Sequence, residues 1–268
     1  MFPFHDNNPT VRTPFVTVTL VVLNVLAFLW LISLPDGGAR ESLIVRRGFV
    51  PARLAQLSNP NQVVVVDLDK PEREDIPQIR HAPAVQIILP PDRGDVLASL
   101  ITTMFLHGGW MHLIGNMWFL WLFGNNIEDR LGHFVFFCFY LVGGLFATFC
   151  HWAHDPASTI PVIGASGAVS AVLGAYAVTF PTARVKCLIF LFIFVTIIEL
   201  PALAVLGIWF VTQLLDALGS VHLGLDGGVA WWAHVGGFVS GCVLMPLLSA
   251  GAPPPGGAWH EEAKQAFE

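Results

Sequence analysis

The sequence predicts an all-α polytopic membrane protein with six transmembrane helices and a long first loop. Hydrophobic residues make up 54% of the 268 residues and charged residues only 12%, and the mean hydropathy is +0.66. Soluble globular domains carry about 25% charged residues, so this composition is typical of a chain embedded in lipid. The apolar residues also gather in runs of about 20, the length that a helix needs to cross a bilayer.

Charge and cysteine content argue against other classes of protein. The net charge is −6 and no basic run occurs, which argues against nucleic acid as a partner. The four cysteines are scattered through apolar runs without zinc-like or disulfide-like spacing: Cys138, Cys150, Cys187 and Cys242. We therefore interpret them as packing residues, and we expect neither a metal ion nor another cofactor.

The first span precedes a large polar segment. Residues 1–12 form a short polar cytoplasmic lead, and an apolar run from Phe15 to Leu34 follows. Residues 35–100 hold most of the charge, and we interpret them as an extracytoplasmic loop with some structure of its own. Two β-prone runs in this loop, Gln62–Val66 and Ala84–Leu89, are able to pair with each other.

Three spans and a polar break follow the loop. The second span covers about Trp110–Phe123, and we expect the polar stretch Gly124–Gly132 to end it. The third span covers roughly His133–Trp152. The fourth, Ser166–Phe180, begins with the small residues around a serine.

The last third of the chain holds two spans and a tail. The apolar run Leu188–Leu218 is too long for one crossing and is broken at Glu199-Leu200-Pro201, because proline in a helix interior removes a hydrogen bond. We place the fifth span at about Pro201–Leu218 and expect the segment before it on the membrane surface or partly inserted. The sixth span is about Val229–Leu248, and we expect residues 250–268 to be a disordered cytoplasmic tail.

The basic residues predict how the six-helix domain, residues 13–249, lies in the membrane. With a cytoplasmic N-terminus, the short inner segments hold Arg12, Arg130, Arg184 and Lys186, and the short outer loops hold neither Lys nor Arg. The positive-inside rule favours this orientation, and it exempts loops longer than roughly 60 residues, such as the first. We therefore expect a multi-pass protein of the cell (inner) membrane with both termini cytoplasmic.

Polar side chains gather at one depth in the second, fourth and sixth spans. In the predicted orientation these spans run from outside to inside, and their outer turns carry His112, Asn116, Ser166 and His234. Ionisable side chains inside a span are costly and are functional candidates by default. We therefore expect a site that opens to the extracytoplasmic side.

These residue types are those that acyl transfer needs. A serine hydroxyl such as that of Ser166 becomes a nucleophile when a neutral imidazole such as His234 takes its proton. Asn116 lies on the same helix face as His112, and both could donate to an oxyanion together with the Ser166 backbone N–H. Because no Asp or Glu lies near His234 in the sequence, we expect a Ser–His dyad without a third member.

Small residues predict that the fourth and sixth spans approach closely. Small residues at helical spacing let two membrane helices come within hydrogen-bonding range of each other's side chains. They occur on both spans, at Gly167, Ala171 and Gly174 and at Gly237 and Gly241.

At these residues the chain resembles the rhomboid family of intramembrane serine proteases. The resemblance covers roughly residues 100–245 and rests on four motifs: His107–Asn116, Gly124–Gly132, Gly164–Gly167 and Ala233–Gly237. It implies a six-helix core and cleavage of peptide bonds in or near transmembrane segments of other proteins. It also implies roles for single residues: Ser166 as nucleophile, His234 as base, Asn116, His112 and the Ser166 N–H as oxyanion hole, and Glu128 and Arg130 as structural residues.

The chain departs from the family pattern at two places. Some relatives carry an aromatic residue one turn after the nucleophile, stacked on the base, whereas this chain has Ser170 there. The imidazole must then be held in another way. The first loop is also extended at residues 62–93.

Other functions stay open or are disfavoured. The main alternative is a catalytically silent rhomboid-like protein that binds membrane clients, which is expected to lack the serine or the histidine. Glu199 and Asp216 would be ion-site candidates in a transporter, but no repeat of broken helices occurs. A zinc protease lacks its His-Glu-x-x-His motif, and His151 and His154 lack a third metal ligand. The expected partners are transmembrane substrates and membrane lipid.

Overall fold

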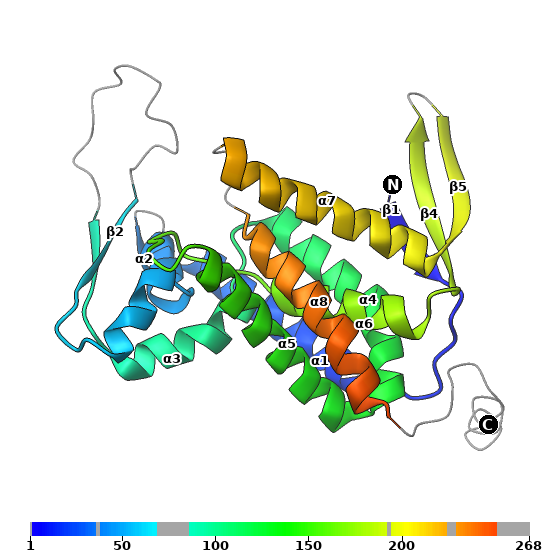
Figure 1. Cartoon of the computed structure of the whole chain (residues 1–268), viewed down its shortest axis with the longest axis horizontal. Helices are drawn as coiled ribbons and strands as arrows, with labels where there is room; N and C mark the ends of the chain where they lie inside the picture. The colour runs from blue at the N-terminus through cyan, green and yellow to red at the C-terminus, as the bar shows by residue number, and fades with distance from the viewer. Residues whose placement is uncertain (1, 36–37, 69–85, 192–193, 224–228, 251–268) are drawn as a thin grey trace.

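The computed structural model describes residues 2–35, 38–68, 86–191, 194–223 and 229–250. It has the predicted helical membrane architecture, with a small sheet at one end of the helices and a second sheet with short helices at the other end (Figure 1). The predicted tail, apart from residue 250, lies outside the described residues.

Six long helices lie where the sequence predicts spans: α1 (Phe15–Ser33), α4 (Trp110–Leu131), α5 (His133–His154), α6 (Ser166–Thr179), α7 (Ala202–Leu223) and α8 (Trp231–Leu248). Among the described residues, α1, α5, α7 and α8 are each long and apolar enough to cross a bilayer. Helix α4 and the preceding helical segment Arg93–Phe105 are together long and apolar enough to form one span. The two segments are bent by 79° relative to each other. The polytopic membrane fold is thus confirmed.

Helix α6 is the centre of the bundle. Every residue from Gly167 to Ala177 is buried, and the helix contacts α4, α5, α7 and α8. A helix that is apolar on all sides is a core helix. At 14 residues it extends about 21 Å, less than the roughly 30 Å of hydrocarbon in a bilayer. A helix of this length cannot cross the hydrocarbon layer of a bilayer from one surface to the other.

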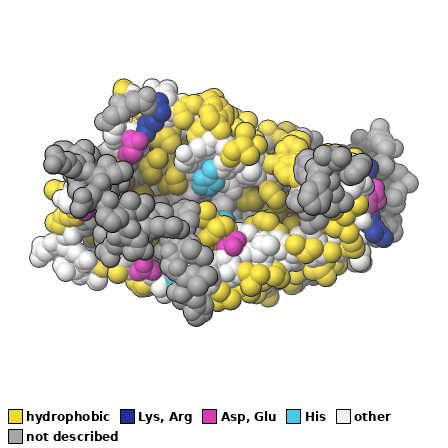
Figure 2. All heavy atoms as spheres, turned by 90° about the horizontal axis from the view of Figure 1, so that it is seen from above, with side chains coloured by type: hydrophobic (Ala, Val, Ile, Leu, Met, Phe, Trp, Pro, Cys, Tyr) yellow, Lys and Arg dark blue, Asp and Glu magenta, His cyan; other side chains and the backbone are white. Residues whose placement is uncertain are grey.

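The surface between the two ends is mostly hydrophobic. Figure 2 shows one face of the molecule, on which hydrophobic side chains cover much of the middle and Lys and Arg side chains lie toward the two ends. Large exposed apolar side chains occur on α1, α5, α7 and α8. A surface of this kind is expected where lipid surrounds the helices.

The predicted polar break after the second span is wrong. Helix α4 continues through this stretch to Leu131, and Gly132, at φ +78°, separates it from α5. The sequence suggests a loop because the stretch is polar, but Asn126, Glu128 and Asp129 are buried in the structure. Their partners come from the N-terminal segment, so the helix can continue without unpaired polar groups.

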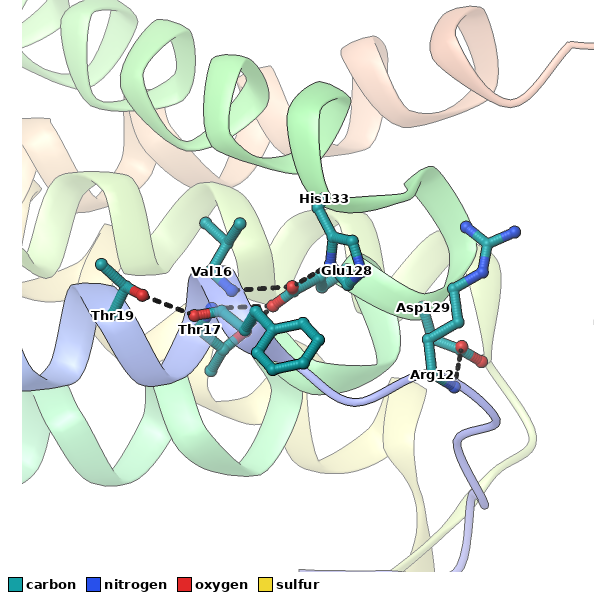
Figure 3. A network of polar contacts seen from close by, with 8 residues as sticks. Arg12, Val16, Thr17, Thr19, Glu128, Asp129 and His133 are labelled. Atoms are coloured by element: carbon teal, nitrogen blue, oxygen red, sulfur yellow. Dashed lines mark hydrogen bonds and ion pairs between the residues drawn. The ribbon is translucent and has the colours of Figure 1, made fainter. Parts of the chain in front are cut away.

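The Glu128 carboxylate joins three helices. It accepts hydrogen bonds from the backbone N–H groups of Val16 and Thr17, at 2.8 and 2.7 Å, and from the Thr17 hydroxyl at 2.7 Å. Its other contact is His133 Nδ1 at 2.6 Å (Figure 3). The first N–H groups of a helix have no partner within the helix, and a carboxylate is the best acceptor for them. Glu128 therefore caps α1 from α4 and holds the start of α5.

The N-terminal segment and the segment between α6 and α7 together form a three-stranded β-sheet. Strands β1 (Phe2–Asp6), β4 (Arg184–Leu191) and β5 (Phe194–Pro201) make an antiparallel sheet in the order β1-β4-β5. The segment before the fifth span is thus a β-hairpin, which its apolar composition alone did not distinguish from an inserted helix. The polar lead is likewise not a plain tail, because β1 pairs with β4.

The side chain of Asp6 fastens this sheet to the bundle. Its carboxylate accepts hydrogen bonds from the Tyr176 hydroxyl at 2.7 Å and from Asn126 Nδ2 at 2.8 Å. Burial raises the pKa of the Asp6 carboxyl above its ordinary value, against the hydrogen bonds, which lower it. The strand after α6 and the N-terminal strand are therefore held at the end of α4 and α6.

The first loop folds around a small core of its own. It contains α2 (Ala39–Arg47), η1 (Pro51–Leu57), β2 (Val64–Asp67), β3 (Gln86–Leu89), α3 (Arg93–Thr102) and η2 (Thr103–Phe105). The predicted pairing of the two β-prone runs is confirmed, since β2 and β3 are antiparallel partners. Their inward side chains pack with Val45 and Val50 of the same loop.

We expect Glu128→Ala to destabilise the bundle by about 3 kcal/mol or more, because it leaves buried donors of α1 without an acceptor. Thermal unfolding in detergent measures this change. Glu199→Gln is the matched control, because Glu199 is exposed and its ion pair with Lys186 is long, at 3.9 Å. This control should change stability by less than about 0.5 kcal/mol. Equal stability of the two variants would contradict the capping role of Glu128.

Candidate active site

The segment that leads into α6 is fixed on both sides. Val162 pairs with Phe49 through two backbone hydrogen bonds of 2.7 and 3.0 Å. The Thr103 hydroxyl donates to the Val162 carbonyl at 2.6 Å, and the Gly164 N–H donates to the Thr103 carbonyl at 2.9 Å. The position of Ser166 thus depends on both the first loop and η2.

Gly164 brings the His112 ring next to the start of α6. Its φ of +121° is in the region that favours glycine. A Cβ at this position would lie only 2.5 Å from His112 Nε2. The glycine therefore permits the backbone conformation and also leaves room for the imidazole, two residues before Ser166.

Helices α6 and α8 approach closely beside Ser166 and His234. A Cβ at Gly237 would lie 2.2 Å from the Gly167 carbonyl oxygen, and a Cβ at Gly241 would lie 1.9 Å from the Ala171 carbonyl oxygen. A Cβ at Gly167 would in turn lie 3.8 Å from the Cβ of Ala233. The predicted close approach of the two helices is present.

The His234 ring is held by α7. His234 Nδ1 lies 2.7 Å from Gln213 Oε1, and this contact is buried. The Trp209 ring, also on α7, has its centroid 6.1 Å from the His234 ring, and the Trp231 ring is edge-on at 5.8 Å. Gln213, Trp209 and Trp231 thus surround the His234 ring. The Ser170 hydroxyl instead donates to the Ser166 carbonyl at 2.6 Å.

Ser166 is half-buried and borders empty space. A cavity of about 20 Å³, lined by Ser166, Thr103, Thr148 and neighbouring small residues, lies beside it. This volume suits roughly one water molecule. Within the described part of the chain, no direct hydrogen bond joins Ser166 Oγ to His234. Such bonds are often long in the absence of substrate and shorten in the reacting complex.

A larger cavity of about 260 Å³ reaches the same region. It is lined by polar side chains as well as apolar ones, among them His112, His151, His154, Asp155 and Ser158. Because these groups can bind water, the cavity offers a polar environment between α4, α5 and α8.

The other predicted site residues lie on α4 or directly before it. Asn116 is 8% exposed, and one of its amide hydrogens goes to the His112 carbonyl at 3.0 Å. The amide has a second hydrogen for another acceptor. His107 is fully buried, with its ring edge-on to that of His112 at 5.0 Å, so it supports the His112 ring and is not a solvated loop histidine.

The sequence-based prediction missed Gln213 and Trp209. Two ionisable residues near the fifth span are Glu199, which lies on β5, and Asp216, which lies within α7. An amide in the middle of an apolar run was the available signal, since a polar side chain inside a span seeks a hydrogen-bond partner.

Comparison with known proteins finds a family and several relatives. Residues 95–251 match the model of the Rhomboid domain. Rhomboid-like protein 11, chloroplastic, of Arabidopsis thaliana is 38% identical over 26% of this chain and 25% of its own length. Rhomboid protein 1, mitochondrial, of Saccharomyces cerevisiae is 35% identical over 34% of this chain and 28% of its own length. Presenilin-associated rhomboid-like protein A, mitochondrial, of Danio rerio is 33% identical over 32% of this chain and 23% of its own length. The matches thus span about a quarter of each relative.

We expect Gly241→Ala to destabilise the protein by about 1–3 kcal/mol, because the added methyl group meets the backbone of α6 and forces the two helices apart. Thermal unfolding in detergent measures the change. Gly207→Ala on α7 is the control, because a Cβ there meets nothing within 4 Å. It should be neutral or stabilising by up to about 1 kcal/mol. If Gly241→Ala were as stable as Gly207→Ala, the close approach would not matter to the fold.

Proposed function

The chain belongs to the rhomboid family, and from this premise we propose that it is an intramembrane serine protease. It would hydrolyse peptide bonds in or near transmembrane segments of membrane protein substrates. The observation that carries the proposal is the contact of α6 with α8 at Gly167, Ala233 and Gly237. Ser166 and His234 are the neighbours of these residues in the sequence, and both belong to the membrane domain.

In the proposed reaction, His234 takes the proton of the Ser166 hydroxyl as the oxygen attacks the substrate carbonyl carbon. The carbonyl oxygen becomes an oxyanion, which Asn116, His112 and the Ser166 backbone N–H would stabilise. His234 then gives its proton to the leaving amine. Water, activated by the same imidazole, hydrolyses the acyl-enzyme and restores Ser166.

Helix α6 supports a reaction below the membrane surface. It is shorter than the bilayer is thick, and Ser166 is at its start. The cavity with His151, His154 and Ser158 in its wall would supply water to this depth. A substrate segment entering the same cavity would bring its carbonyl group toward Ser166.

The proposal includes the orientation predicted from the sequence, with a cytoplasmic N-terminus. Arg12, Arg184 and Lys186 lie on the segments that form the β1-β4-β5 end of the bundle, and Arg130 is in the last turn of α4. Asp129 accepts from the backbone N–H of Arg12 at 2.8 Å, which places Arg12 near the end of α4. The positive-inside rule counts basic residues on short segments such as these and exempts the long first loop, so the active site would open to the opposite side.

We expect Ser166→Ala and His234→Ala each to abolish cleavage of a single-span model substrate in detergent. A fluorophosphonate probe should label the wild-type protein and not Ser166→Ala, because labelling needs an activated hydroxyl. Glu199→Gln, far from the site, is the control for both measurements. An unlabelled, inactive wild-type protein that still binds transmembrane segments would favour the alternative, a silent client-binding protein.

We expect Asn116→Ala to lower kcat by about 10²–10³, the cost of removing one oxyanion donor. The cleavage rate of the same substrate at saturation measures this loss. Unchanged thermal stability would separate the effect from misfolding. A drop of less than about threefold would show that Asn116 is not a donor.

A further inference from the structure

The geometry points to a third member of the active site on α7. We infer that Gln213 is a positioning residue, whose side-chain oxygen accepts a hydrogen bond from His234 Nδ1 and thereby leaves Nε2 as the acceptor for the Ser166 hydroxyl proton. This inference rests on the proposed function. It replaces the expectation of a dyad without a third member.

Gln213 is buried in contact with His234. It is 8% exposed, in a part of α7 that is apolar apart from Thr212 and Asp216. The distance from Gln213 Oε1 to His234 Nδ1 is 2.7 Å, and both residues are buried. An amide buried in a membrane protein is costly unless it is hydrogen-bonded. The His234 ring provides the partner for one end of the amide.

A second hydrogen bond sets which end of the amide faces His234. Gln213 Nε2 lies 3.2 Å from Thr212 Oγ1, and the Thr212 hydroxyl donates to the Trp209 carbonyl at 2.6 Å. Because that single hydroxyl hydrogen is already used, the Thr212 oxygen can only accept from Gln213. The amide nitrogen therefore faces Thr212, and the amide oxygen faces His234.

The direction of these bonds determines the histidine tautomer. An amide oxygen only accepts, so His234 Nδ1 must carry the hydrogen. In a neutral imidazole the other nitrogen, Nε2, then has the free lone pair. This is the nitrogen that a general base needs to take a proton from Ser166.

Helix α7 also orients the plane of the ring. Trp209 precedes Gln213 by four residues and so lies on the same helix face, and its ring flanks His234 with a centroid distance of 6.1 Å. One turn of α7 thus supplies both an aromatic neighbour and a hydrogen-bond acceptor. The titratable groups whose charge acts on His234 are His112 on α4 and His151 on α5.

A neutral amide has an advantage over a carboxylate at this depth. A carboxylate would stabilise the imidazolium more strongly, but its burial in a membrane domain carries a large desolvation cost. Glutamine orients the ring and adds no charge. The expected effect of its loss is therefore moderate, about 10–100-fold, as for other groups that orient a functional histidine.

The test compares Gln213→Leu, which keeps the approximate volume and removes the acceptor, with Gln213→Glu, which keeps an acceptor. We expect Gln213→Leu to lower kcat about 10–100-fold with KM changed by less than about twofold. We expect Gln213→Glu to retain more activity than Gln213→Leu. In Gln213→Glu, the fall of kcat/KM on the acidic side of the pH profile should also occur at higher pH than in the wild-type protein. The reason is that a carboxylate favours the protonated His234 ring.

Asp216→Asn is the control on the same helix, since Asp216 is exposed. Wild-type activity in Gln213→Leu, equal to that of Asp216→Asn, would overturn the inference and leave the proposed function intact. The inference would also be overturned if Gln213→Leu and Gln213→Glu lost the same amount of activity, both were less stable to heat, and the pH profile of Gln213→Glu did not shift. Gln213 would then have only a structural role. An inactive, unlabelled wild-type protein would instead refute the proposed function.

Discussion

The close contact between α6 and α8 is the constraint on which the rest of the structure depends. In lipid, helices gain little from burying apolar side chains against each other, so their association relies on tight packing and on hydrogen bonds. Glycines at positions 174, 237 and 241 let the backbones of α6 and α8 touch. The same contact brings the segments that carry Ser166 and His234 together inside the bundle, and α4, α5 and α7 cover the other sides of α6.

A polar site in such a bundle needs partners for its polar atoms, and each partner comes from a distant part of the chain. The Glu128 carboxylate accepts hydrogen bonds from the first N–H groups of α1, and Thr103 holds the segment before Ser166. Gln213 Oε1 lies 2.7 Å from His234 Nδ1. These contacts keep buried donors and acceptors satisfied where lipid offers none. They also make the site a product of the whole bundle and not of α6 and α8 alone.

Much of this fold could be predicted from the sequence, because hydropathy and helix length locate spans well. The six helices, the pairing of β2 with β3 and the approach of α6 to α8 follow from such local patterns. The β4–β5 hairpin could not be predicted, because an apolar strand and a membrane-inserted segment have similar compositions. The helical end of α4 was missed because its polar residues are satisfied by residues more than 100 positions earlier. At the site, the serine, the histidines and the asparagine stood out as polar residues in spans, whereas the role of Gln213 depends on the packing of α7 against α8.

The capping of α1 by Glu128 has a consequence for biosynthesis. The ribosome makes Val16 112 residues before it makes Glu128, which corresponds to roughly 6–22 s of translation at 5–20 residues per second. During that interval the amino end of α1 has no acceptor from the rest of the protein for its first N–H groups. Helix α1 thus completes its docking only after α4 has been translated, and insertion and assembly become separate stages of its maturation.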